Sequence, residues 1–302
     1  MSAVLITGAT GKQGGSLIKS LISRNAPFEV LAVTRDPTSA SAQKLRSLSS
    51  NIKLVQGDLD NPAEIFQNAR RLASAPIWGV YSVQKQAAIG NSSEEVQGKS
   101  LVDEAINQDV KFFVYSSVDR GGEKRSYNNP TKIPHFIKKH NIEHHLIDRA
   151  KNHHMKWTIL RPAAFYENLT PDFFGKMFAT CFKMALKGKP LQLVATSDIG
   201  YFGAEAFLNP DKYEGKGISL AGDELTFDQM DQTFFRRMGQ NLPMAFRPIC
   251  SLFMAAMKDM GYMFKWFHDE GYGADIQKLR EINPEMKTFD TWLVNNSGFS
   301  KK

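Results

Sequence analysis

Residues 3–14 read Ala-Val-Leu-Ile-Thr-Gly-Ala-Thr-Gly-Lys-Gln-Gly, an apolar run that leads directly into three evenly spaced glycines, Gly8, Gly11 and Gly14. The residues that follow are apolar at helical spacing, so the stretch predicts a strand, a tight turn and a helix in succession. Glycines at such a turn let backbone N–H groups approach a pyrophosphate at the helix N-terminus. A glycine turn without a ligand is the alternative, but this context favours dinucleotide binding. The predicted contacts in the turn are Gly8, Thr10, Gly11, Lys12, Gln13 and Gly14.

Short apolar or β-branched runs, separated by stretches with helical spacing, recur along the first half of the chain. They are Ala3–Ile6, Phe28–Thr34, Ile52–Gln56, Ile77–Ser82, Lys111–Tyr115 and Trp157–Leu160. Neighbouring parallel strands need a crossover connection, which is usually a helix. The alternation therefore predicts a doubly wound α/β fold, with a parallel Rossmann sheet covered by helices on both faces.

Beyond residue 162 the regular alternation of strands and helices ends, and Met- and Phe-rich segments with helical spacing follow. A further strand is predicted at Ile218–Ala221 and an amphipathic helix around Asp275–Ile282. We therefore predict a Rossmann domain at residues 1–162, to which a segment near residues 191–208 returns. A smaller α+β lobe for a substrate or partner is predicted at residues 163–302, interleaved with that domain. The Met- and Phe-rich stretch from residue 244 to 267 is either the core of this lobe or an apolar substrate pocket.

Composition and charge narrow the class of protein. The 302 residues are 42% hydrophobic and 23% charged, which excludes disordered and collagen-like chains. Between Asp119 and Arg161 there are ten Lys or Arg and four Asp or Glu, so six of the seven net positive charges lie there. This local concentration suits a small anionic ligand, and no nucleic-acid-binding motif accompanies it. We therefore expect no direct nucleic-acid partner.

No secretory signal or membrane span is predicted, because the N-terminus lacks a basic region and the longest apolar stretch, residues 243–267, contains charged residues. The expected location is the cytoplasm, with the nucleus as an alternative, and the expected state is a monomer or weak homodimer. Cys181 and Cys250 are too few for a disulfide framework or a zinc site and are expected to be buried. The pairs His144-His145 and His153-His154 lack the spacing of metal ligands, so no metal is expected.

The end of the second predicted strand reads Thr34-Arg35. A site for NAD(H) would carry an acidic residue here for the ribose 2′-hydroxyl, whereas a guanidinium can pair with a 2′-phosphate. Arg35 therefore favours NADP(H), with Lys12 as a second cation. A solvated charge at the strand end is the alternative for Arg35.

Two further strand ends carry candidate cofactor contacts. Asp58 and Leu59 follow the third strand, where the carboxylate could accept a hydrogen bond from the adenine amino group. Asp58 is equally compatible with a helix N-cap. The fourth strand ends in the expected region of the nicotinamide ribose, with Ser82, Val83 and Gln84.

Several blocks in the correct order resemble the NmrA-like family of atypical short-chain dehydrogenases, and the resemblance spans nearly the whole chain. The blocks are the glycine turn, Gly57-Asp58-Leu59, Ile133-Pro134-His135-Phe136 with Lys139, Arg161-Pro162-Ala163 with Phe165-Tyr166-Glu167-Asn168, Leu220 to Thr226, Asp275-Ile276 with Arg280, and Phe289 with Trp292-Leu293. The resemblance implies an NADP-binding Rossmann domain and a second lobe. It assigns the pyrophosphate to residues 11–14, the 2′-phosphate to Arg35 and the nicotinamide ribose to Lys139. It further implies that Phe165, Tyr166, Glu167 and Asn168 line the nicotinamide end.

Ordinary short-chain dehydrogenases place a Tyr four residues before the Lys on one helix, and here His135 occupies that position. His135 is a candidate general acid, with a packed histidine as the alternative, and Ser117 is a candidate substrate contact. The leading hypothesis is an NADPH-dependent reductase of a small apolar carbonyl or imine compound, as in secondary-metabolite tailoring. The rival is a non-catalytic NADP(H) sensor that regulates a protein partner such as a transcription factor.

Overall fold

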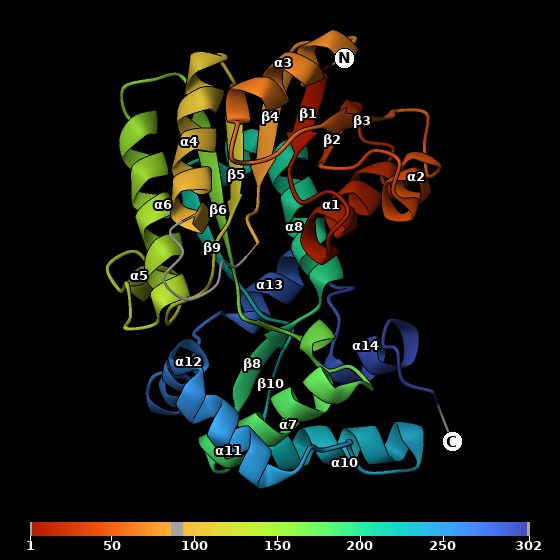
Figure 1. Ribbon diagram of the computed structural model, residues 1–302, viewed down its shortest axis with the longest axis vertical. Coiled ribbons are helices and arrows are strands. Elements are labelled where there is room, and N and C mark those ends of the chain that lie inside the picture. Colours follow the sequence, from red (N-terminus) through yellow and green to blue (C-terminus); the bar gives the residue numbers. More distant parts are fainter. Residues whose placement is uncertain (1, 86–92, 301–302) are drawn as a thin grey trace. The chain divides into compact units, whose positions relative to one another are not determined.

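The structure is a computed structural model that describes residues 2–85 and 93–300 and divides into two compact units (Figure 1). Each unit is built from segments that are discontinuous in sequence. The first unit comprises Met1–Ser117, Ile137–Leu160 and Ile199–Ile218, and the second comprises Val118–Phe136, Arg161–Asp198 and Ser219–Lys302. These bounds differ from the predicted division at residue 162. Residues 118–136 belong to the second unit, and the later segment that returns to the first unit is residues 199–218 rather than a segment near 191–208.

A seven-stranded sheet forms the centre of the first unit, with the strand order β3-β2-β1-β4-β5-β6-β9. Its strands are β1 Ser2–Ile6, β2 Phe28–Thr34, β3 Ile52–Gln56, β4 Ile77–Ser82, β5 Phe112–Ser116, β6 Lys156–Pro162 and β9 Lys216–Leu220. The pairs that link β3 through β6 are all parallel. The order reverses between β1 and β4, as in a Rossmann fold, so the predicted doubly wound α/β class is confirmed.

Helices cover both faces of this sheet. They are α1 Lys12–Ser23, α2 Ala40–Arg46, α3 Pro62–Leu72, α4 Ser93–Asn107, α6 Pro134–Ala150, α8 Thr196–Leu208 and α9 Pro210–Tyr213. On one face, buried residues of α3, α4 and α6, such as Phe66, Leu101 and Ile142, share a core with the strands. On the other face α8 packs closely against α1, because a Cβ at Gly200 would lie 2.5 Å from the carbonyl carbon of Ser16.

The second unit contains a three-stranded sheet in the order β10-β8-β7, formed by β7 Ala164–Phe165, β8 Leu191–Val194 and β10 Asp223–Leu225. Its helices are α5 Glu123–Ser126, the 3-10 helix η1 Tyr166–Asn168, α7 Phe173–Leu186, α10 Phe227–Met238, α11 Arg247–Ala256, α12 Lys258–Asp269, α13 Ile276–Ile282 and α14 Phe289–Asn295. The predicted helix near residues 275–282 corresponds to α13, which Asp275 caps by accepting from the Lys278 N–H at 3.2 Å. In the described residues no helix is long and apolar enough to cross a membrane.

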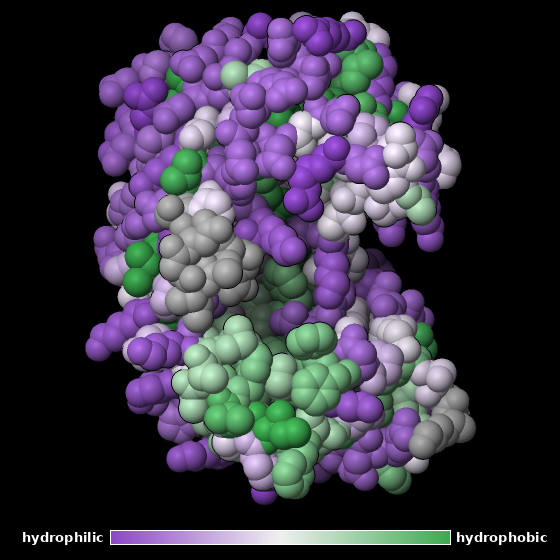
Figure 2. All heavy atoms as spheres, viewed as in Figure 1, coloured by the Kyte–Doolittle hydropathy of each residue, from purple (hydrophilic) through white to green (hydrophobic). Residues whose placement is uncertain are grey.

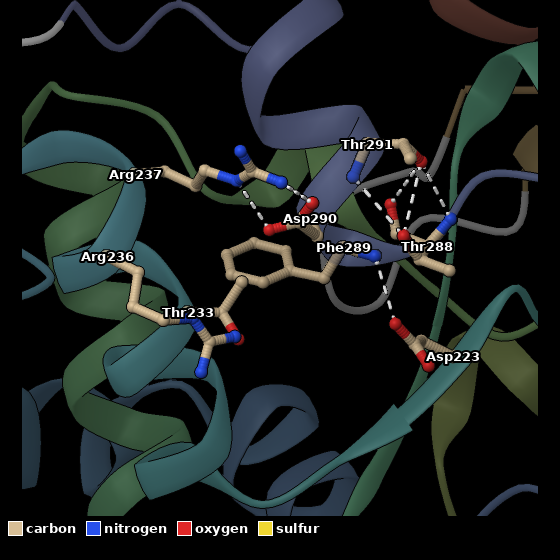
Figure 3. Close-up of polar contacts among 8 residues, drawn as sticks. All are labelled: Asp223, Thr233, Arg236, Arg237, Thr288, Phe289, Asp290 and Thr291. Carbon is tan, nitrogen blue, oxygen red and sulfur yellow. Dashed lines mark hydrogen bonds and ion pairs between the residues drawn. The ribbon is translucent and has the colours of Figure 1, made fainter.

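Polar contacts fix α14 within the second unit (Figure 3). The backbone N–H of Phe289 donates to the Asp223 carboxylate of β10 at 3.0 Å. The guanidinium of Arg237, on α10, forms two bonds to the Asp290 carboxylate. Thr288 caps the helix, and its backbone N–H donates to Thr291 Oγ1 at 3.0 Å. The C-terminal segment is therefore an integral part of this unit.

Candidate functional site

The carboxyl ends of β1 and β4 form the point where the strand order reverses, which is where doubly wound sheets bind ligands. The side chain of Thr7 joins these two strand ends. Its Oγ1 donates to the Tyr81 carbonyl at 3.1 Å and accepts from the Val83 N–H at 2.9 Å. This contact holds the start of the glycine turn against the end of β4.

Close backbone approaches explain the three glycines of the turn. Gly8 has a φ of 58°, and a Cβ there would lie 2.7 Å from Val83 Cγ1. A Cβ at Gly14 would lie 2.4 Å from the Gly8 carbonyl oxygen, and one at Gly11 would lie 3.1 Å from the same atom. Helix α1 begins directly after Gly11, with no side-chain cap and no acidic residue in its first turn. The helix N-terminus thus offers backbone N–H groups and a favourable dipole to an anion.

Gln13 and Ser116 connect the first turn of α1 to the end of β5, because the Ser116 hydroxyl donates to Gln13 Oε1. Ser117, the candidate substrate contact, is 4% exposed. Its backbone N–H donates to the Leu160 carbonyl at 2.7 Å. Both serines therefore lie at the same edge of the sheet as the glycine turn.

Arg35 lies exposed immediately after β2, the strand next to β1. Asp36 faces its own loop, since its carboxylate accepts from the Thr38 N–H at 2.8 Å and from the Thr38 hydroxyl at 2.6 Å. These hydrogen bonds lower the pKa of Asp36. The Asp36 carboxylate is thus engaged in a local turn, and the Arg35 side chain is exposed at this strand end.

Asp58 is exposed after β3 and does not cap the following helix. Its carboxylate accepts from the Asp60 N–H at 3.0 Å. The N-cap of α3 is Asn61, whose side chain accepts from the Glu64 N–H at 3.3 Å. The cap alternative for Asp58 is therefore wrong, while its proposed adenine contact, together with Leu59, stays a prediction.

Ser82 and Gln84 are buried at the end of β4, and the Gln84 amide donates to Ser82 Oγ at 2.8 Å. The carboxamide oxygen of Gln84 is also buried, and in the described part of the chain no donor reaches it. A buried acceptor without a donor costs free energy unless a ligand supplies one. Gln84 therefore provides an acceptor beside the glycine turn.

Lys139 and His135 lie four residues apart on α6, as predicted, and each has a carboxylate partner. The Lys139 ammonium lies 2.9 Å from Glu94 Oε1, on α4. His135 is 7% exposed, and its Nδ1 lies 2.8 Å from Asp259 Oδ1, on α12. Sequence reasoning missed both partners because they come from other helices.

Residues 165–168 belong to the second unit, where Tyr166 is completely buried between aromatic rings. Its ring stacks on Trp292 with a centroid distance of 5.4 Å. Glu167 accepts from the Thr196 hydroxyl at 2.9 Å and from the Trp292 indole N–H at 3.2 Å. The nicotinamide contact proposed for Phe165, Tyr166, Glu167 and Asn168 stays a prediction.

Asp198 lies in the same cluster, and burial raises its pKa to about 6. A hydrogen bond from the Lys287 N–H, at 2.9 Å, opposes this rise, whereas the Glu167 carboxylate adds to it. Burial likewise raises the pKa of Tyr166, with further contributions from Asp223 and Asp198. The cluster therefore contains a carboxyl group that titrates near neutral pH.

Asp198→Asn is expected to stabilise the protein at pH 7 and to leave its stability at pH 4 unchanged. The folded-state pKa lies above the usual value of 3.8, so the folded protein retains a proton that the unfolded chain has lost. Stability therefore falls as the pH rises from about 4 to 6, by up to about 3 kcal/mol. Asparagine remains neutral and still accepts from Lys287. Thermal unfolding from pH 4 to 8 measures the difference.

Exposed Asp228→Asn is the control for this experiment, and its pH profile should follow that of the wild type. An unchanged slope between pH 4 and 6 in Asp198→Asn would contradict the assignment.

The Met- and Phe-rich stretch from residue 244 to 267 divides into a buried and an exposed part. Cys250, Phe264 and Phe267 belong to the core of the second unit. The exposed large apolar residues of the stretch are Phe246, Ile249, Leu252, Met257 and Tyr262. Figure 2 shows apolar side chains gathered over α11, α12 and α7. Both cysteines are buried, as predicted. Among the described residues, no three or more His, Cys, Asp or Glu form a group that could hold a metal ion.

The strand order and the geometry of the glycine turn define a Rossmann-type α/β protein. The model of the NmrA-like family matches residues 1–293. The chain therefore belongs to the NmrA-like family.

It is 28% identical over 258 residues to an NmrA-like oxidoreductase of Aspergillus hancockii, and the match covers 78% of this chain and 72% of the relative. It is also 23% identical to an NmrA-like domain protein of Dictyostelium discoideum, covering 96% of each chain.

Solved structures share the fold at low identity. A mutant NmrA superposes with a TM-score of 0.73 at 17% identity, covering 98% of this chain and 95% of the other. An Escherichia coli NADPH-dependent quinone oxidoreductase complexed with NADPH has a TM-score of 0.69 at 20% identity, covering 95% and 97% of the two chains. Both proteins thus have the same fold as this chain.

Proposed function

We propose that the protein is an NADPH-dependent reductase that acts on a small, largely apolar carbonyl or imine compound. The observation that carries the proposal is the glycine turn, where each Cβ position is filled by protein backbone or by Val83. A turn of this shape lets backbone N–H groups come close to a pyrophosphate. The oxidoreductase names of the fungal relatives, and the NADPH bound to the bacterial quinone oxidoreductase, support the same assignment.

The residues of the first unit fit an NADP(H) molecule along the sheet edge. The N-terminus of α1 would bind the pyrophosphate, and Arg35 would pair with the 2′-phosphate. The carboxamide oxygen of Gln84, which no donor reaches in the described residues, would accept a hydrogen bond at the end of β4. Lys139 would bind the nicotinamide ribose.

The bound cofactor would supply hydride, so the chain's own residues would bind, orient and move protons. Ser117, at the end of β5, is a candidate for orienting the substrate carbonyl or imine. His135 is a candidate proton donor, because Asp259 holds its Nδ1 and thereby fixes the orientation of the ring. The Tyr of ordinary short-chain dehydrogenases is absent at this position.

A panel of apolar ketones, quinones and imines, with NADPH absorbance as the readout, tests the proposed reaction. Substrate-dependent loss of NADPH is expected, together with tighter calorimetric binding of NADPH than of NADH. Tight NADPH binding without turnover of any compound would count against the reductase.

A second candidate function is a non-catalytic NADP(H) sensor with a protein partner. The exposed apolar residues of α11, Ile249 and Leu252, favour it, because exposed apolar patches are typical of protein contact surfaces. A sensor must bind the oxidised and reduced cofactors with different affinities. Calorimetric titrations with NADP⁺ and NADPH measure that difference, and equal affinities would remove this candidate.

Arg35→Glu is expected to lower the preference for NADPH over NADH by about two orders of magnitude, because a charge-assisted pair is lost and a like charge is introduced. The ratio of the two dissociation constants is the measurement. Arg71→Glu, at the exposed C-terminal turn of α3, is the matched control and should leave the ratio unchanged. An unaltered ratio in Arg35→Glu would remove the 2′-phosphate assignment.

A further inference from the structure

Glu94 is a completely buried carboxylate in the first turn of α4, a helix that otherwise packs apolar residues against the sheet. Burying an ionised carboxylate is strongly unfavourable unless a partner compensates for the lost hydration. The helix N-terminus contributes a favourable dipole, but the charged partner of Glu94 is the Lys139 ammonium at 2.9 Å. The structure therefore places this carboxylate beside the residue proposed to bind the nicotinamide ribose.

The packing of α4 on α6 explains why the two side chains meet. Gly98 lies one turn after Glu94, and a Cβ there would lie 2.4 Å from Ile142 Cδ1. Ile142, in turn, lies three residues after Lys139, on the same side of α6. The absence of a side chain at Gly98 lets the two helices approach closely, which brings the Glu94 carboxylate within reach of the ammonium.

Within the described residues, Lys139 is the cation in ion-pair contact with Glu94, and no hydrogen-bond donor with acceptable geometry reaches either carboxylate oxygen. Among the described residues, the charged partner of this carboxylate is therefore Lys139. Lysine has a flexible stem and three rotatable N–H donors, so its ammonium needs an anchor to keep one position. An ammonium paired with one carboxylate still has at least two N–H donors for ligand hydroxyl groups.

We propose that Glu94 is a positioning residue for the cofactor site, which holds the Lys139 ammonium where it can donate to the nicotinamide ribose hydroxyls. The inference rests on the proposed NADP(H) function and extends it to a residue on a different helix. Glu94 acts through Lys139, so its effect on cofactor binding should disappear when Lys139 is removed.

A double-mutant cycle on NADPH binding tests this coupling by calorimetry. Glu94→Gln and Lys139→Met are each expected to weaken binding about tenfold. The double variant should bind no more weakly than Lys139→Met alone. The matched control is Glu95→Gln, which removes the neighbouring carboxylate that pairs with Lys99 at 2.6 Å, and it should leave the affinity unchanged.

A Glu94→Gln variant that loses stability but keeps wild-type affinity would overturn the proposal, and so would one that binds NADPH more tightly. If Glu94→Gln does not fold, Glu94→Asp retains the charge on a shorter side chain and should weaken binding by less than Lys139→Met. Wild-type affinity in that variant would also overturn the proposal. Failure of the wild-type protein to bind NADPH would instead refute the proposed function itself.

Discussion

Gly14→Ala is expected to weaken NADPH binding at least a hundredfold and to destabilise the protein by about 3 kcal/mol or more, a size typical of steric strain in a packed site. The added Cβ would lie 2.4 Å from the Gly8 carbonyl oxygen, 2.7 Å from the Gly8 carbonyl carbon and 2.8 Å from the Thr7 carbonyl oxygen. All three atoms are backbone, so no side-chain rotation relieves the overlap. The start of α1 must therefore move away from the end of β1.

Gly15→Ala is the matched control for this substitution. A Cβ at Gly15 would lie 3.2 Å from the Ala9 carbonyl oxygen, which a shift of a few tenths of an ångström relieves. Alanine also has the higher helix propensity, by about 1 kcal/mol. Urea unfolding and NADPH calorimetry should therefore separate the two variants clearly. A Gly14→Ala protein with wild-type affinity and stability would show that the turn is not constrained as described.

Asp119→Ala is expected to cost at least about 4 kcal/mol of stability and to disrupt the second unit, because several buried donors lose their acceptor at once. The Asp119 carboxylate is completely buried. It accepts from the Gly122 N–H at 3.0 Å, from the Gly273 N–H at 2.8 Å, and from the hydroxyls of Ser126 and Ser219. It thus joins segments that are about 100 and 154 residues distant in sequence.

Asp275→Ala provides the comparison within the same unit. Asp275 is an exposed N-cap with one backbone donor, and losing such a cap costs about 1 kcal/mol. Chemical denaturation followed by tryptophan fluorescence should rank the two variants, since Trp266 and Trp292 lie in the core of this unit. Equal losses for Asp119→Ala and Asp275→Ala would mean that the Asp119 network contributes little.

Most of the Rossmann sheet could be predicted from the sequence, because its strands are buried on both faces and appear as continuous apolar runs. The small sheet of the second unit could not. Its strands β7 and β10 have two and three residues, too few to show any periodicity. Residues 118–136 are placed in the second unit with contacts such as those of Asp119, whose donors Ser219 and Gly273 are 100 and 154 residues away and leave no local signal in the sequence.

In the candidate site, too, some residues could be predicted from the sequence and others could not. The glycine turn and Arg35 follow strands directly, so their positions could be predicted from local sequence. The contacts of Lys139 with Glu94, and of His135 with Asp259, depend on how separate helices pack. One signal was present for Glu94, because it lies on the apolar face of α4 with Gly98 and Leu101, where a carboxylate is out of place.

The close contact of α8 with α1 affects how the protein folds during translation. Helix α1 carries the glycine turn, but its covering partner at Gly200 is translated some 180 residues later. The seven-stranded sheet is likewise incomplete until its edge strand β9, which ends at Leu220, has been translated. A nascent chain therefore has an uncovered apolar face until these residues have been added, so this protein should depend on holding chaperones more than one whose Rossmann domain is contiguous in sequence.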